Sequence, residues 1–592
     1  MILILPEFLK LYPGIILLSI LRPLYLTYCS LYGGEGRVQR NRCPCKMWKR
    51  GTIIIGILSI ILYFCFSQRE RYASILLTLE DLRNSYDFII VGGGSSGSVL
   101  AARLSEVKNY HVLLIEKGDE ASYASYVPIF APLQGLFDPT WEYESEPQRN
   151  SHYGYKDRIS KITRGKSLGG SGHYNYHIIS NETFEYCTES IRNRVRSKGS
   201  PYHILSSRLG DDKLAQAFLS EEARFPGWNF ETILQGIYKG KRFSNFDAYL
   251  KPVLNRKNLH VLINTEVIKI DFKDKSPESL HITHQKEGKT IKLNKIKKLI
   301  LAGGAINTPK LLFESGVGPK DQINKLNVTL VEDIPVGNEL QDHLTCPLYF
   351  HLKNDTGSVN LANLINPQEI WKYLLHKEGI YSTSALSVQA IDPQKDTSIL
   401  IYNVGAPHKD IYIKLSGMRP DTFDETFPSN TDPWKKGFIF LAGCTKPKSI
   451  GRIFMHPNRT MSIDPNYLHN SKDTSCTIKA IQTAVDIGNG KAFKKLGAQL
   501  HYPNYKECTD LEQSFQNPQY VECVAKSSCM TKYHPTSTTP LDVIVDRNFK
   551  VKGLNNIFIV DGGVLPRGSF MYPNSVITDM AECASEVFKD NL

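Results

Sequence analysis

The chain has 592 residues, of which 41% are hydrophobic and 22% charged, a composition typical of a folded protein with several domains and unlike that of a disordered chain. Its mean hydropathy of −0.26 excludes a protein with many membrane spans. The net charge of +12 is uneven, because residues 1–50 carry eight Lys or Arg against two Glu and hold half of the surplus. The remaining charge is low for the length, so no nucleic-acid partner is expected.

An uncharged apolar segment at residues 52–66 follows a basic leader, residues 1–50. Fifteen residues are short for a bilayer span, which needs about 17–25, but they suit the apolar core of a signal peptide. We expect residues 51–67 to be a signal peptide or a signal anchor, with a buried helix as the third alternative. Met47 is an alternative start of translation. In the first two cases the body is secreted or faces a lumen or the outside of a membrane.

Cysteines and sequons agree weakly with such a location. Cys508, Cys523 and Cys529 cluster late in the chain, and one loop-closing disulfide is expected there. Cys43-Pro-Cys45 has no second pair nearby, so no zinc site is expected. Four N-glycosylation sequons, near the number that chance gives, would make a secreted form a glycoprotein. They lie at Asn181, Asn327, Asn354 and Asn458.

A dinucleotide-binding motif begins the body of the chain. Residues 87–91 form an apolar strand, and residues 92–97 follow with the sequence Gly-Gly-Gly-Ser-Ser-Gly. A helical pattern comes next, and then a second apolar strand over residues 111–115. This order of strand, glycine turn, helix and strand is typical of a Rossmann fold.

Each position of the motif has a physical role. Gly92 permits the tight turn, Gly94 lets a pyrophosphate approach the backbone, and Gly97 lets helix and strand pack closely. The helix start, which includes Ser96, presents backbone N–H groups to the phosphates. Glu116 lies nineteen residues beyond Gly97, where its carboxylate can bind the ribose hydroxyls. The motif by itself does not choose between NAD and FAD.

Four further blocks follow in order along the chain. They are residues 164–171 (Arg-Gly-Lys-Ser-Leu-Gly-Gly-Ser) with Asn175, residues 304–318 (from Gly-Ala-Ile-Asn-Thr-Pro to Gly-Val-Gly), residues 336–343 (Val-Gly-Asn-Glu-Leu-Gln-Asp-His), and the stretch from Tyr533-His534-Pro535 through Asp561-Gly562 to Asn574. Together with the dinucleotide motif, these blocks resemble the glucose-methanol-choline (GMC) family of FAD-dependent alcohol oxidoreductases. The resemblance covers roughly residues 84–590 and points to the animal, insect-type glucose-dehydrogenase-like branch.

The resemblance implies an α/β fold in which a discontinuous, Rossmann-like FAD-binding domain holds an inserted α+β substrate-binding domain. Residues 84–344 would form the main part of the FAD-binding domain, together with a lid and some substrate-domain segments. Residues 345–530 would form the main part of the substrate-binding domain. Residues 531–592 would return to the FAD-binding domain with the catalytic pair. Within the second block, Pro309 is expected to begin a helix.

The resemblance also implies which residues contact FAD. Glycines of the first block would let the chain lie against the flat isoalloxazine, Val267 would contact FAD through its backbone, and Asp561 would help to hold the ribityl–pyrophosphate part. Beyond the dinucleotide motif, the implied contacts are Arg164, Gly169, Gly170, Asn175, Val267, Asp561 and Gly562. Tyr174 stands where some relatives carry a histidine bonded to the flavin, so non-covalent FAD is expected, although the adjacent His173 keeps a covalent bond open.

Oxidation of an alcohol to a carbonyl needs a base for the hydroxyl proton and an acceptor for the hydride, here flavin N5. By the resemblance, His534 is the base, because a neutral imidazole accepts protons near working pH. Asn574 would orient the substrate oxygen. Taken singly, each could be an ordinary turn residue beside Pro535 or Pro573. Three other histidines are expected to be satisfied polar residues: His173, His177 and His343.

The residues beside the catalytic pair depart from the family pattern. The usual glycine-containing run after His534-Pro535 is missing, and Phe-Met-Tyr-Pro occupies residues 570–573 before Asn574. This apolar patch favours an apolar alcohol such as a retinoid, sterol or terpenoid over a free sugar. Oxygen or a quinone-like acceptor would reoxidise the flavin, and the sequence does not choose between them. The departures keep two alternatives open: a lyase with structural FAD, and a catalytically degenerate flavin-binding protein.

Overall fold

The structure is a computed structural model, and it describes residues 78–199, 205–206, 212–354, 356–405, 407–428, 436–568 and 571–590. The basic leader and the apolar segment 52–66 lie outside the described residues, so the expectations for them stay predictions. Within the described ranges, no helix combines the length and the apolar character that a bilayer crossing requires.

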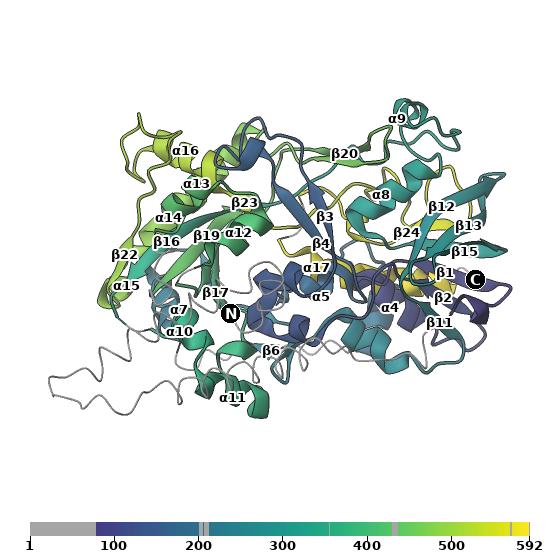
Figure 1. The fold of residues 1–592 in the computed structure, drawn as a ribbon, viewed down its shortest axis with the longest axis horizontal. Helices are drawn as coiled ribbons and strands as arrows, with labels where there is room; N and C mark the ends of the chain where they lie inside the picture. The colour runs from purple at the N-terminus through teal and green to yellow at the C-terminus, as the bar shows by residue number, and fades with distance from the viewer. Residues whose placement is uncertain are drawn as a thin grey trace, which may run out of the picture.

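A parallel sheet of five strands forms the half of the molecule at the right of Figure 1. Its strands lie in the order β11 (Leu259–Leu262), β2 (Val112–Ile115), β1 (Tyr86–Val91), β15 (Ile296–Leu301) and β24 (Ile557–Ile559). All neighbouring pairs are parallel, and the residues of β2 are buried throughout, as expected for strands covered on both faces. The predicted Rossmann-like α/β core is therefore confirmed.

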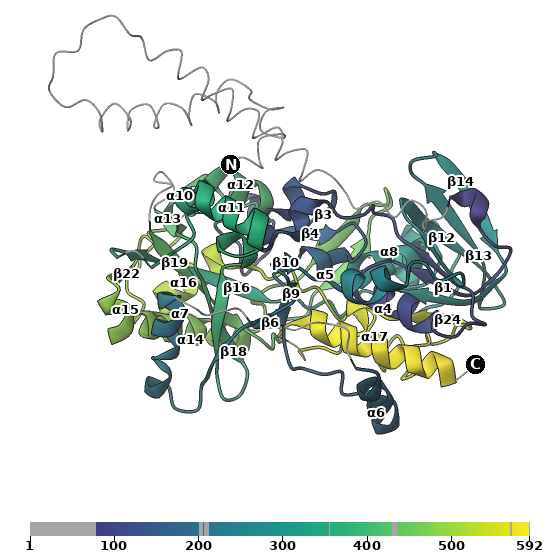
Figure 2. The ribbon, with the colours of Figure 1, turned by 90° about the horizontal axis from the view of Figure 1, so that it is seen from below.

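Helices and a second sheet cover the two faces of the parallel sheet (Figure 2). On one side α4 (Ser95–Leu104) packs against α17 (Pro573–Asp590). On the other side lies an antiparallel sheet of β12 (Thr265–Lys273), β13 (Ser276–His284) and β14 (Lys289–Asn294). Because α17 is the last helix of the chain and α4 is next to the first strand, this half of the molecule is assembled from discontinuous segments.

A seven-stranded antiparallel sheet forms the other half of the molecule, at the left of Figure 1. Its strands are β22 (Ala498–Leu500), β16 (Leu344–Leu352), β19 (Gly437–Cys444), β18 (Thr397–Tyr402), β17 (Leu386–Ile391) and β7 (Asn229–Thr232), with β23 (Met530–Thr531) also paired to β16. Most of these strands fall within residues 345–530, and β7 joins from an earlier segment. We call this the substrate-side sheet.

Successive side chains of each strand point to opposite sides, so the substrate-side sheet has two different faces. One face packs against helices to form a core that includes Phe350, Ile399 and Phe440. The helices that cover this face are α7 (Lys213–Leu219), α14 (Ser471–Gly488), α15 (Lys491–Lys495) and α16 (Pro518–Ser528). The other face turns toward the parallel sheet and is described with the site below.

Shorter elements connect and cover the two sheets. Beside the cavity these are η3 (Pro128–Leu136), β3 (Thr140–Glu144), β4 (Lys161–Gly165), α5 (Gly170–Tyr174), α10 (Leu361–Leu364), α11 (Pro367–His376), η8 (Ile380–Ser382), α12 (Lys409–Ser416) and α13 (Pro420–Thr426). Elsewhere lie α6 (Glu189–Lys198), α9 (Lys320–Lys325), β20 (Arg452–Met455) and β21 (Met461–Asp464).

The helix of the second block begins earlier than expected. α8 spans Gly304–Glu314, so Pro309 lies inside the helix, and the prediction that it starts there is wrong. Proline inside a helix leaves the carbonyl four residues before it without its usual N–H donor. Here that carbonyl belongs to Ala305, and it accepts a hydrogen bond of 2.8 Å from Thr538 Oγ1. A long-range contact therefore replaces the missing helical bond.

Four disulfides join all eight cysteines of the described residues. The expected loop-closing disulfide is confirmed as Cys508–Cys523, while Cys529 pairs outside the cluster with Cys346. Two further pairs were not expected: Cys187–Cys583 and Cys444–Cys476. Partners as far apart as 396 residues are decided by the tertiary fold, which local sequence cannot reveal.

Candidate active site

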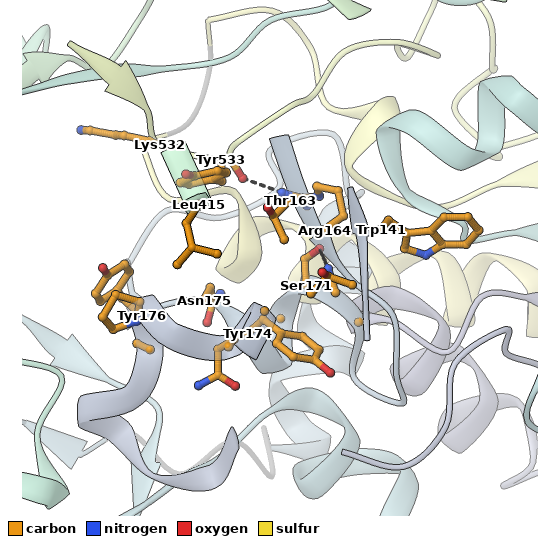
Figure 3. Close-up of a pocket in the computed structure, with 18 of the residues that line it drawn as sticks. Trp141, Thr163, Arg164, Ser171, Tyr174, Asn175, Tyr176, Leu415, Lys532 and Tyr533 are labelled. Atoms are coloured by element: carbon orange, nitrogen blue, oxygen red, sulfur yellow. Dashed lines mark hydrogen bonds between the residues drawn. The ribbon is translucent and has the colours of Figure 1, made fainter. Parts of the chain in front are cut away.

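A cavity of about 1580 Å³ lies between the parallel sheet and the substrate-side sheet. Pockets for one small ligand usually measure about 300–1,000 Å³, so this cavity has room for a dinucleotide and a second molecule. Segments distant in sequence line it, and Figure 3 shows Arg164 and Tyr533, joined by a hydrogen bond, in the same pocket as Tyr174 and Asn175. The sequence-predicted residues that line it are Gly92, Gly94, Ser96, Glu116, Arg164, Gly170, Asn175, Val267, His534, Asp561, Gly562 and Asn574.

Two sequence-predicted residues do not line the cavity: Gly97 and Gly169. A Cβ on Gly97 would collide with the carbonyl oxygen of Gly92, so Gly97 serves the close packing of helix on strand. Gly169 has a φ of +91°, and a Cβ there would lie 2.9 Å from Cβ of His173. Both glycines are therefore required by the backbone next to the cavity. This agrees with the packing role expected for Gly97, and the FAD contact expected for Gly169 stays a prediction.

The dinucleotide end of the cavity is built around the start of α4. A Cβ on Gly94 would project into open cavity space, with Cα of Gly170 as its nearest neighbour at 3.9 Å. The Glu116 carboxylate accepts hydrogen bonds from the N–H groups of Gly93 (2.7 Å) and Gly118 (2.6 Å). Burial raises the pKa of Glu116 above its ordinary value, and these donors oppose the shift. A bare backbone, a helix start and a fixed carboxylate are what a bound FAD requires.

Asp561 ties the C-terminal segment to α8 beside the cavity. Its carboxylate accepts hydrogen bonds from Gly304 N–H (2.8 Å), Thr308 Oγ1 (2.6 Å) and Gly563 N–H (2.8 Å). Burial raises its pKa, and the three donors favour the ionised form. The adjacent Gly562 lines the cavity, so Asp561 holds the backbone that faces the cofactor space.

His534 lies on the loop after β23, and two contacts hold its backbone. Its N–H donates to Asp342 Oδ1 at 2.7 Å, and the preceding carbonyl, of Tyr533, accepts from Arg164 Nη1 at 2.6 Å (Figure 3). The imidazole Nδ1 is buried and has no hydrogen-bond partner within the described residues. Its ring lies edge-to-face to that of His343, with centroids 5.4 Å apart.

The surroundings keep the imidazole of His534 neutral. Burial lowers the pKa of His534 well below its ordinary value, and the nearby His343, Lys532 and Arg164 lower it further. Burial also lowers the pKa of Lys532, to about 8. A neutral, buried imidazole facing the cavity can accept a proton from a bound alcohol.

Asn574 is the second residue of α17 and contacts Ser95 at the start of α4. Its Oδ1 accepts a hydrogen bond of 2.6 Å from Ser95 Oγ. A Cβ on Gly172 would lie 3.0 Å from this oxygen, so the small residue leaves room for the asparagine. With its oxygen engaged by Ser95, Asn574 has its amide N–H groups to offer to a substrate oxygen in the cavity.

Sequence reasoning missed Asp342 as a functional residue, although it lies in the third block of the resemblance. It is buried and accepts four hydrogen bonds, from the N–H groups of His343 (2.8 Å) and His534 (2.7 Å) and from the hydroxyls of Tyr467 and Thr531. Burial raises its pKa, and the four donors oppose the shift. Asp342 is therefore a positioning residue for the His534 loop. An acidic residue beside His343 in a conspicuous motif was the available signal.

The other histidines singled out earlier do not face the cavity. His173 is buried, with Nε2 2.9 Å from Ser125 Oγ and Nδ1 3.3 Å from Ser244 Oγ. Nε2 of His343 donates to the carbonyl of Thr445 at 2.8 Å. Three histidines are absent from the cavity lining: His173, His177 and His343. Tyr174, by contrast, lines it.

The substrate half of the cavity has an apolar wall. Successive side chains of the substrate-side sheet point to opposite faces, and apolar side chains of one face line the cavity. Residues 400 and 402 of β18 face the cavity, while residues 399 and 401 face the helices. Met571 and Tyr572, part of the apolar patch expected before Asn574, are buried against this wall, and Phe570 lies outside the described residues. The wall residues that line the cavity are Leu386, Leu400, Tyr402, Ile439, Leu441 and Tyr572.

Comparisons with known proteins agree with this geometry. Family models described as GMC oxidoreductase match residues 229–345 and 447–581, and a Rossmann-like NAD(P)-binding model matches residues 90–128. "Neither inactivation nor afterpotential protein G" of Drosophila melanogaster is 29% identical over 91% of this chain and 97% of its own length. Ecdysone oxidase of Spodoptera littoralis is 27% identical over 85% of this chain and 91% of its own length.

Solved structures share the fold. A formate oxidase superposes with a TM-score of 0.71 at 20% identity, over 86% of this chain and 98% of that one. Pyridoxine 4-oxidase from Mesorbium loti superposes with a TM-score of 0.69 at 22% identity, over 85% of this chain and 99% of that one. The family models, the insect relatives and a cavity whose residues fit FAD all agree, and the chain belongs to the GMC family of FAD-dependent alcohol oxidoreductases.

Proposed function

We propose that the chain oxidises the CH–OH group of an apolar alcohol such as a retinoid, sterol or terpenoid. The observation that carries this substrate class is the apolar wall formed by one face of the substrate-side sheet, in the same cavity as His534. A free sugar needs many hydrogen-bonding groups around it, and an apolar wall would leave its hydroxyls without partners. Burial of an apolar body against the wall instead supplies binding free energy, at about 25 cal/mol per Å².

Within this proposal His534 and Asn574 divide the chemistry. His534 takes the hydroxyl proton on its neutral imidazole, and Asn574 N–H groups hold the alcohol oxygen as negative charge develops. FAD, when bound, would accept the hydride from the carbon that carries the hydroxyl group. The loop anchored by Asp342 and Arg164 keeps the imidazole in place.

The relatives support an alcohol substrate without naming one for this chain. Ecdysone oxidases of two moths are 27% and 26% identical to it, and their name refers to a steroid alcohol. Glucose dehydrogenase of Drosophila melanogaster, at 26% identity, refers to a sugar instead. The lining of the cavity favours the first class.

We further propose that FAD is held without a covalent bond. Tyr174 lines the cavity where a flavin-linked histidine would be needed, and His173 is turned into contacts with two serines. Acid precipitation should therefore release the flavin into the supernatant. Flavin that stays with the precipitated protein would contradict this. Reoxidation by oxygen or by a quinone-like acceptor is distinguished by peroxide production.

A secreted or lumen-facing location is also a proposal. Four disulfides favour an oxidising compartment, and the asparagines of all four sequons are exposed. The apolar segment 52–66 would act as a cleaved signal peptide or as a retained anchor. Glycosidase treatment should lower the apparent mass of the cellular protein, and sequencing of its N-terminus separates cleavage from retention. An unglycosylated product with residues 52–66 intact in the cytosol would contradict the location.

The reaction itself is tested by anaerobic titration of the purified flavoprotein with retinoids, sterols, terpenoids and sugars, followed at the flavin absorbance band. An apolar alcohol should bleach the band, and His534→Ala should slow bleaching about 10²–10⁴-fold without loss of flavin. Bleaching by sugars alone would refute the substrate class. A flavin that no alcohol reduces would favour the lyase or the degenerate flavin-binding protein.

A further inference from the structure

The helix α11 exposes two large apolar side chains to solvent. Trp371 is 56% exposed and Leu375 is 67% exposed, the two highest values among the large apolar side chains of the described residues. They are four residues apart and therefore lie on one face of the helix, one turn from each other. α11 lies at the lower edge of the molecule in Figure 1. Such a pair on a protruding helix marks an interaction surface.

The opposite face of α11 lines the cavity. Ile370, Tyr373 and Leu374 are lining residues, whereas Trp371 and Leu375 are not. The helix is thus a wall one helix thick between the apolar substrate half and the exterior.

Basic side chains lie on α11 and at its C-terminal end. Lys372 is exposed on α11, and Lys377 ends the helix. The hairpin with Lys239 and Lys241 lies beside this end, because a Cβ on Gly240 would meet the carbonyl of Lys377. Two acidic residues share the segment: Glu369, which accepts a hydrogen bond from Ile380 N–H, and Glu378. Four lysines against two glutamates leave the surface positive.

We propose that α11 docks on a lipid bilayer, with Trp371 and Leu375 inserted into the interface and the lysines toward anionic headgroups. A tryptophan next to lysines is the composition that favours the bilayer interface. The apolar alcohol would then enter the cavity from the membrane beside α11, a step that rests on the proposed function. A partner protein or a second copy of this chain is the competing occupant of the same face.

Quenching of Trp371 by brominated lipid tests the docking without any need for activity. The full-length holoprotein is mixed with vesicles of brominated phosphatidylcholine, with and without phosphatidylserine. Trp371→Phe is measured in parallel, so that the difference reports Trp371 alone among the five tryptophans. We expect the difference signal to be quenched, and more strongly with phosphatidylserine. Leu375→Ser should weaken the vesicle dependence of this signal about tenfold.

Val543→Ser is the matched control, because Val543 is 39% exposed and lies outside the cavity lining. It should leave the Trp371 signal unchanged. Two results would overturn the docking: vesicles that bind the protein without quenching Trp371, or a Trp371 signal that changes with protein concentration in the absence of lipid, which indicates a second copy. Because flavin bleaching by alcohols is measured separately, failure of the docking leaves the proposed function intact, and the reverse also holds.

Discussion

Replacement of Asp342 by Asn tests whether the catalytic loop depends on one buried carboxylate. In the wild type, Oδ1 accepts from two backbone N–H groups, those of His343 and His534, and Oδ2 accepts from the hydroxyls of Tyr467 and Thr531. An amide preserves shape but has one accepting oxygen. That oxygen must stay with the N–H groups, since these cannot reorient, while the hydroxyls can rotate to accept from the amide nitrogen.

The expected loss follows from the bonds that change. A hydrogen bond to a charged group contributes about 1.5–3 kcal/mol, against about 1 kcal/mol between neutral groups. In Asp342→Asn all four hydrogen bonds involve a neutral amide in place of a carboxylate. The free energy of unfolding should therefore fall by about 2–4 kcal/mol. The weaker anchor on His534 should also slow flavin reduction about tenfold at saturating alcohol, since small misplacement of a base is costly.

The assay compares Asp342→Asn with Asp473→Asn. Asp473 is equally buried and accepts from Lys448 N–H (2.7 Å) and from the N–H (2.7 Å) and hydroxyl (2.6 Å) of Ser449. Neither Asp342 nor Asp473 lines the cavity, whereas His534, which Asp342 holds, does. Both variants should unfold at lower urea concentration, and only Asp342→Asn should reduce flavin slowly in anaerobic stopped-flow. Equal rates in the two variants would refute the positioning role of Asp342.

Four further predictions concern other residues of the site and one disulfide. Asn574→Ala removes the amide donor, so flavin reduction should slow about 10²–10³-fold with flavin retained; an unchanged rate would exclude Asn574 from catalysis. Because the pKa of His534 lies well below 6.5, kcat/KM should stay flat from neutral pH down past 6.5. Lys532→Met removes a cation that disfavours the imidazolium, so the pKa of His534 rises and the acid limb should move to higher pH; movement to lower pH would contradict this. Replacing both Cys187 and Cys583 by Ser should lower the free energy of unfolding by about 2–5 kcal/mol in urea titrations, and no change would show that the bond adds nothing.

The cofactor half of this protein could be predicted from contiguous sequence. Its motif occupies residues 86–116, where strand, glycine turn, helix and acidic residue lie within one βαβ unit, so short-range rules suffice. The positions of Gly92, Gly94 and Glu116 at the cavity follow from this local geometry. The family resemblance predicted that His534 and Asn574 act together, although 40 residues separate them, and both line the cavity.

Other features could not be predicted from the sequence, because they depend on contacts between residues far apart in the chain. The positioning role of Asp342 depends on its contacts with His534, Tyr467 and Thr531, which are distant in sequence. Pro309 sits inside α8 because Thr538, more than two hundred residues away, satisfies the Ala305 carbonyl.

Sequence alone therefore determined the Rossmann-like core, since it depends on a short motif whose backbone geometry is nearly self-contained. The family resemblance added FAD as the cofactor and the prediction that His534 is the base. Tertiary structure decided which cysteines pair, which carboxylate holds the loop that carries His534, and which face of α11 lines the cavity. These depend on contacts between residues far apart in the chain, and such contacts are selected by the packing free energy of the whole fold.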